Sequence, residues 1–109
     1  DNPVHYEEFF CPAALFFTVK NEQEVINLAN DSPFGVGSSV FTKDIERGKR
    51  VAEQLDTGMV FINHSTWTQA DLPFGGTKGS GYGRELSELG VYEFVNKKLI
   101  RVSELSDRF

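Results

Sequence analysis

The chain has 109 residues, of which 39% are hydrophobic and 25% charged, and its formal net charge is −5. This composition is typical of a soluble globular domain, or of part of one. An acidic chain without a basic block is a poor match for nucleic acid, and no apolar run approaches the roughly 18–20 residues that span a bilayer. We therefore expect a cytoplasmic protein that binds neither nucleic acid nor membranes.

The first part of the chain alternates between strand-like and helix-like patterns. The apolar run Ala13–Val19 indicates a buried strand. Asn21, with Glu24 three residues later, predicts an N-capped helix that ends at the turn residues NDSPFG. Gly37–Phe41 then predicts a second strand.

The same alternation continues in the middle of the chain. Apolar residues at helical spacing predict a helix from Asp44 to Leu55, and Met59–Asn63 is a third apolar strand. The order strand, helix, strand, helix, strand predicts an α/β fold with parallel strands joined by crossover helices.

The last third of the chain has a different character. His64–Gly83 is polar and glycine-rich, and so long a loop is usually functional or packed against something else. We expect a helix from Arg84, broken at Gly90 and resuming through Phe94. Lys97–Val102 could form a terminal strand, whose pairing edge another subunit would supply.

The stretch PFGGTKGSGYGREL, residues 73–86, raises the question of a phosphate site. A P-loop fails because Lys78 is followed by Gly79 instead of Ser or Thr. The run GSGYG is one residue short of a dinucleotide fingerprint, and no strand immediately precedes it. The composition favours a loop that approaches other backbone closely or adopts positive φ.

No complete catalytic group is visible in the residues themselves. Cys11 lies among apolar and acidic neighbours, which do not favour a nucleophilic thiolate, so we interpret it as a buried structural cysteine. As the one cysteine it excludes an internal disulfide and is compatible with a reducing compartment. His5 and His64 are too few for a metal site, so we assign no metal and no catalytic residue.

Several residues have a possible binding role. Adjacent acids on a strand point to opposite faces, so Glu7 and Glu8 form no dyad, yet one of them could accept hydrogen bonds from a ligand's hydroxyls. Trp67 and Phe74 could line an apolar pocket, or could simply anchor the loop.

Four stretches resemble motifs of the NAD(P)-dependent aldehyde dehydrogenase superfamily, in the family's order. They are EEFFCP at residues 7–12, NDSPFGVGSSVFTKD at residues 30–44, GMVFIN at residues 58–63 and PFGGTKGSGYGREL at residues 73–86. The resemblance implies the carboxy-terminal part of that family's catalytic domain over residues 1–95. It implies an oligomerisation strand and tail over residues 96–109, with homo-oligomers forming through Lys97–Val102.

The resemblance also implies roles for single residues. Glu8 falls on the glutamate that binds the nicotinamide-side ribose hydroxyls, and Phe10 on the phenylalanine near the nicotinamide. Phe74 falls on the aromatic residue at the substrate entrance. Cys11 departs from the family's glycine, which puts the local geometry of that turn in doubt.

The resemblance places the family's nucleophilic cysteine, general-base glutamate and oxyanion-hole asparagine in an upstream part, together with most of the NAD or NADP site. We therefore expect this piece alone to oxidise no aldehyde. The alternative is a non-catalytic, truncated interaction module that pairs with a full-length subunit.

The substrate class follows from the stretch after the third strand. VFINHSTWTQADLPFGG looks most like the succinate-semialdehyde dehydrogenase branch, in which a hydroxyl residue at the place of Thr68 helps hold the substrate carboxylate. With Trp67 and Phe74, Thr68 is a predicted substrate-pocket residue. Two alternatives stay open. Thr68 could be a solvent-facing loop residue, and the enzyme could be a dehydrogenase for another small aldehyde.

Overall fold

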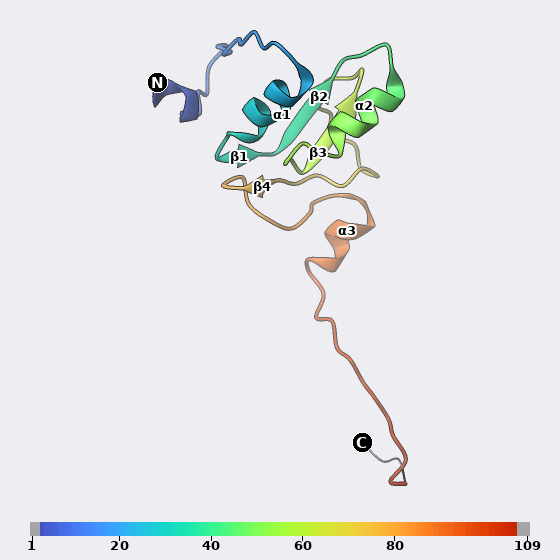
Figure 1. The fold of residues 1–109 in the computed structure, drawn as a ribbon. Coiled ribbons are helices and arrows are strands. Elements are labelled where there is room, and N and C mark those ends of the chain that lie inside the picture. The colour runs from blue at the N-terminus through green and yellow to red at the C-terminus, as the bar shows by residue number, and fades with distance from the viewer. Residues whose placement is uncertain (1–2, 107–109) are drawn as a thin grey trace.

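The computed structural model describes residues 3–106 and has mixed α and β structure (Figure 1). In chain order the elements are η1 (Pro3–Tyr6), α1 (Glu22–Asn30), β1 (Phe34–Gly35), β2 (Gly37–Val40), α2 (Ile45–Ala52), β3 (Met59–Ile62), β4 (Thr77–Lys78) and α3 (Ser87–Tyr92).

The centre of the molecule is the β2–α2–β3 unit, in which two parallel strands are joined by a helix. Gly37 pairs with Met59 at one end of the sheet, and Val40 pairs with Ile62 at the other. A Cβ on Gly48 of α2 would lie 3.2 Å from the Ile62 side chain, so this glycine lets the helix approach β3 closely. The predicted middle strands and their crossover helix are confirmed.

Both longer helices begin at side-chain caps, of which the cap at Asn21 and the helix start near Asp44 are predicted from the sequence. The Asn21 side chain accepts a hydrogen bond from the Glu24 amide at 2.9 Å, and Asp44 caps α2 by accepting from the Arg47 amide at 3.0 Å. An ion pair between Glu22 and Arg47 connects the first turns of the two helices.

The hydrophobic core is thin and the shape is elongated. Among the described residues, Ile26 of α1 and Val51 of α2 are the buried hydrophobic side chains. The radius of gyration is 19.7 Å, whereas a compact chain of this length has about 13 Å. Figure 1 shows why: the segment after α3 extends far from the rest. Much apolar surface is also exposed at both ends of the described chain, including Phe10, Phe16 and Phe94 at 91–95%.

The expected first strand, Ala13–Val19, is wrong for this structure, which has no strand there. A strand forms only when its backbone pairs with a neighbour, and within residues 3–106 this segment pairs with none. Residues 13–18 are all exposed. The apolar run identifies residues suited to burial, but it does not supply the pairing edge.

The prediction for the final helix needs correction as well. It spans Ser87–Tyr92 and runs through Gly90 without a break. Its start is later than expected because Glu85 forms an antiparallel bridge with Phe74, and Leu86 has a left-handed φ of 60°. The expected terminal strand, Lys97–Val102, is irregular within the described chain, since it lies beside no partner strand there.

One short sheet was not predicted. β1 and β4 pair antiparallel, with Phe34 opposite Lys78 and Gly35 opposite Thr77. This pairing brings the glycine-rich stretch beside the turn that follows α1. Each helix within residues 3–106 is too short or too polar to cross a membrane.

Candidate functional site

The loop that carries the predicted substrate residues begins at a clamp at the end of β3. The Asn63 side chain accepts a hydrogen bond from the Thr42 amide at 2.8 Å and donates one to the Thr42 carbonyl at 2.9 Å. Asn63 has a left-handed φ of 56°, a conformation that asparagine tolerates better than most residues. Asn63 thereby fixes where the chain leaves the sheet.

The glycine-rich stretch fixes the other end of this loop. The Lys78 ammonium donates hydrogen bonds to the carbonyls of Asn30 (2.8 Å) and Ser32 (3.1 Å), and it lies 3.3 Å from the Asp56 carboxylate. Lys78 therefore ties together the turn after α1 and the turn before β3. The ammonium donors of Lys78 are thus occupied by protein groups, so Lys78 is not placed as the phosphate-binding lysine of a P-loop.

The glycine-rich stretch has both features that its composition predicts, positive φ and close approach to other backbone. Gly81 and Gly83 have φ values of 102° and 84°, so the positive φ is confirmed. A Cβ on Gly58 would lie only 1.9 Å from the Gly75 carbonyl oxygen, so the close backbone approach is confirmed too.

The three predicted substrate residues meet at one hollow of about 240 Å³. It lies between the start of the parallel sheet and the long loop. Its lining consists of Val36, Gly37, Met59, Thr66, Trp67, Thr68 and Phe74. Residues from four separate parts of the chain thus form one small, mostly apolar hollow with threonine hydroxyls at its wall.

Gly37 is the lining residue at which the long loop packs on β2. A Cβ there would lie 2.8 Å from the Thr66 methyl group and 3.4 Å from the Met59 side chain. The loop therefore packs directly on the first residue of β2. Sequence reasoning missed Gly37, Thr66 and Met59, because only the fold brings them to the loop.

Trp67 is the more exposed of the two aromatic residues that line the hollow, at 57%. Its ring centroid lies 6.3 Å from that of His64 in an edge-to-face arrangement. His64 in turn lies 6.0 Å from the ring of Phe61 on β3. These separations are within the range of favourable aromatic pairs.

The predicted cofactor residues Glu8 and Phe10 do not line this hollow. Both lie in the irregular segment after η1, and both are exposed, Phe10 at 95%. Cys11 of the same segment is exposed as well, so the expectation that it is buried is wrong for this structure. The structure therefore brings the predicted substrate residues together, and leaves the predicted cofactor residues in a separate segment.

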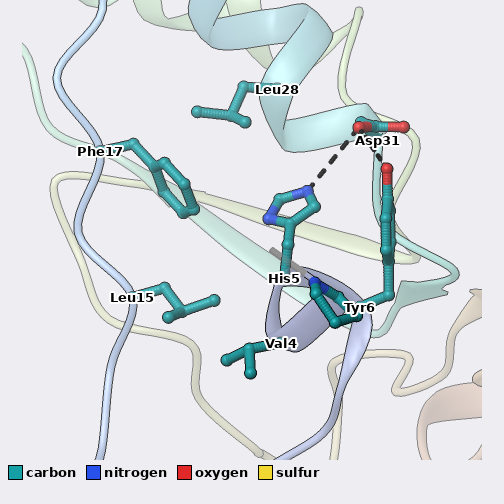
Figure 2. Close-up of a pocket in the computed structure, with 8 residues that line it drawn as sticks. Val4, His5, Tyr6, Leu15, Phe17, Leu28 and Asp31 are labelled. Carbon is teal, nitrogen blue, oxygen red and sulfur yellow. Dashed lines mark hydrogen bonds and ion pairs between the residues drawn. The ribbon is translucent and has the colours of Figure 1, made fainter. Parts of the chain in front are cut away.

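That segment is anchored at a second hollow, of about 690 Å³, where η1 meets the end of α1. Figure 2 shows the His5 ring between Leu15, Phe17 and Leu28, with Asp31 beyond it. His5 Nε2 lies 3.7 Å from the Asp31 carboxylate, and neither ring nitrogen has a hydrogen-bond partner among the described residues.

Tyr6 provides the firmer contact to the same carboxylate. Its hydroxyl donates a hydrogen bond of 3.1 Å to Asp31 Oδ2. This hydrogen bond, and then the negative charge of Asp31, raise the pKa of Tyr6 above the ordinary value of 10.0. Sequence reasoning missed this cluster, because Asp31 lies 25 residues after Tyr6.

The comparison with protein families decides the identity. The model of the aldehyde dehydrogenase family matches residues 1–100. This chain belongs to the aldehyde dehydrogenase family. The earlier resemblance is thereby confirmed, and it covers nearly the whole chain.

Individual aldehyde dehydrogenases are similar at high identity. Succinate-semialdehyde dehydrogenase [NADP(+)] of Deinococcus radiodurans is 54% identical over 101 residues, which are 93% of this chain and 21% of that protein. The structure of succinic semialdehyde dehydrogenase from Streptococcus pyogenes in complex with NADP+ is 48% identical, with a TM-score of 0.89 over 94% of this chain and 23% of that one.

The fold is shared more widely within the aldehyde dehydrogenases. A salicylaldehyde dehydrogenase from Pseudomonas putida, solved with salicylaldehyde, is 36% identical, with a TM-score of 0.88 over 98% of this chain and 22% of that one. The chain thus spans about a fifth of the length of the relatives it matches. Because relatives named for different aldehydes share this fold, the backbone does not select the substrate.

An aldehyde dehydrogenase segment of this shape can supply one wall of a substrate pocket. Its hollow offers an indole and a phenyl ring for an apolar chain, and a hydroxyl for a polar end. Within residues 3–106 no three His, Cys, Asp or Glu side chains are grouped as metal ligands.

Proposed function

We propose that this chain forms the carboxy-terminal part of the catalytic domain of an aldehyde dehydrogenase, and that the enzyme oxidises succinate semialdehyde to the acid with NAD+ or NADP+. The observation that carries the proposal is the hollow where Trp67, Thr68 and Phe74 meet, in a chain of this family. The names of the Deinococcus and Streptococcus relatives support the same substrate.

The chemistry of the hollow suits a short aldehyde with a carboxylate at its far end. The rings of Trp67 and Phe74 would contact the methylene groups, while the Thr68 hydroxyl would donate a hydrogen bond to the carboxylate. A carboxylate also requires charged donors, and in this proposal they come from the rest of the enzyme.

The exposed segment after η1 is proposed to face the cofactor. The Glu8 carboxylate can accept hydrogen bonds from two neighbouring ribose hydroxyls, and Phe10 can pack near the nicotinamide. Both side chains are exposed, so they are accessible to such a ligand. Bound there, NAD+ or NADP+ would accept the hydride; this chain's residues would only bind and orient it.

Residues 96–109 are proposed to form an assembly strand and tail. Leu99, Ile100 and Val102 are 77–91% exposed, and apolar side chains in a segment with no partner strand in the described chain are suited to pairing with a neighbouring subunit. The thin core, with Ile26 and Val51 as its buried hydrophobic residues, supports the same view. Apolar surface that this chain exposes would add to its stability when other protein covers it.

A chimeric enzyme tests the proposal. This chain would replace the matching 101 residues of the Deinococcus enzyme, and formation of NADPH from succinate semialdehyde would be followed. We expect activity near that of the parent, and a lower kcat/KM after Thr68→Val, which removes the hydroxyl at nearly constant size. The 109-residue chain alone should form no reduced nucleotide.

Two results would contradict the proposal. A chimera that assembles like the parent but oxidises no aldehyde would favour the interaction module. Equal kcat/KM for succinate semialdehyde and for an aldehyde of the same length without a carboxylate would favour a dehydrogenase for another small aldehyde.

A further inference from the structure

We propose that His64 is a positioning residue for the substrate pocket, which it serves by holding Trp67 against strand β3. This inference rests on the proposed function, since it assigns a role within the same hollow. His64 lines no part of the hollow itself, so it would act only through its neighbour.

The backbone around Trp67 gives this side chain little support. Asn63 donates its amide to the Val40 carbonyl, and the next backbone–backbone hydrogen bond along the loop joins Leu72 to Gln69. Residues 64–68 form none within the described chain. The position of Trp67 therefore depends on side-chain contacts.

The His64 ring is itself held in place. Its Nδ1 lies 2.6 Å from the Ser65 carbonyl oxygen. A carbonyl oxygen can only accept, so Nδ1 carries the hydrogen and the orientation of the ring is set. The preceding residue, Asn63, is fixed by its two hydrogen bonds to Thr42.

The fixed ring connects the sheet to Trp67. On one side His64 contacts Phe61, whose backbone pairs with Ser39 in the parallel sheet. On the other side it meets Trp67 edge to face, with an interplanar angle of 83°. The ring contacts from Phe61 through His64 to Trp67 therefore connect the wall of the hollow to the hydrogen-bonded strand β3.

Loss of this contact would leave the pocket wall mobile without removing a reacting group. Substrate binding would weaken because the binding-competent position of Trp67 is populated less. An edge-to-face pair of this kind corresponds to about a 2- to 10-fold change in an equilibrium constant. We expect KM to rise within that range while kcat changes less than KM.

Two variants separate the ring contact from the hydrogen bond. His64→Phe keeps an aromatic ring and loses the Nδ1 donor, whereas His64→Asn keeps a donor and loses the ring. Lys49→Asn is the control, because Lys49 is an exposed residue of α2 that lines neither hollow. In the chimeric enzyme, we expect His64→Asn to raise KM for succinate semialdehyde and His64→Phe to leave KM closer to the unaltered value. Lys49→Asn should leave KM unchanged.

A second measurement does not require catalysis. Trp67 is the one tryptophan of the chain, so its near-ultraviolet circular dichroism reports whether its ring is fixed. In the chimeric enzyme, subtracting the spectrum of the Trp67→Phe variant isolates this band. We expect the band in the unaltered chimera and in His64→Phe, and its loss in His64→Asn. A band that His64→Asn preserves would overturn the inference.

The two measurements distinguish failure of this inference from failure of the proposed function. A chimera without activity refutes the proposed function, yet the tryptophan band still tests the contact. An active chimera in which His64→Asn leaves KM unchanged refutes the positioning role alone.

Discussion

The clamp made by Asn63 leads to the most quantitative prediction. Asn63→Gly removes both hydrogen bonds to Thr42 but keeps the backbone free to adopt a φ of 56°. At about 0.5–1.5 kcal/mol for each bond, the free energy of unfolding should fall by about 1–3 kcal/mol. Asn63→Ala should cost about 1 kcal/mol more, because a Cβ disfavours the left-handed region.

Hydrogen exchange locates this effect, and urea unfolding measures its size. The Thr42 amide should exchange faster in both variants, since its acceptor is the Asn63 side chain. Asn63→Asp is the control, because its carboxylate still accepts from this amide. Equal stability of the Gly and Ala variants would refute the backbone argument, and unchanged Thr42 exchange would refute the clamp.

Three other predictions concern two glycines, Lys78 and Tyr6. Gly58→Ala should lower the free energy of unfolding by about 3 kcal/mol or more, since its Cβ would overlap a backbone oxygen, while Gly81→Ala should cost about 1 kcal/mol; urea unfolding compares them. Lys78→Met should cost about 1–3 kcal/mol, and added phosphate should not stabilise the unaltered chain. Tyrosinate absorbance should show Tyr6 titrating above 10.0, and Asp31→Asn should lower its pKa.

The sign of the Tyr6 effect on stability follows from its raised pKa. Because the folded state holds the phenolic proton more tightly, the stabilisation is fully present below the ordinary value of 10.0. It is lost as the pH rises through the folded-state value. A Tyr6→Phe chain should therefore show a weaker loss of stability in that alkaline range.

Local patterns were sufficient for the elements of the central unit. Asn21 and Asp44 cap helices a few residues away, and the apolar strands Gly37–Val40 and Met59–Ile62 are separated by a helical pattern. Such signals depend on neighbours within one or two turns, so they can be recognised without knowledge of the fold. The same holds for the family motifs, which are contiguous in the chain.

Local patterns failed where a partner was required. Ala13–Val19 has the composition of a buried strand, but no strand lies beside it within the described chain. The final helix starts at Ser87 instead of Arg84, because Glu85 pairs with Phe74. In the first place the lack of a pairing partner decided the backbone conformation, and in the second the bridge to Phe74 decided it.

By itself, then, the sequence determined the α/β class, the capped helices and the membership of the aldehyde dehydrogenase family. Only the tertiary structure decided that Lys78 binds the carbonyl of Asn30, 48 residues away, and that Gly37 lies beneath Thr66. The physical reason is that caps and periodicity arise from the nearby chain. A hollow or a clamp depends on which distant segments the fold brings within a few ångströms of each other.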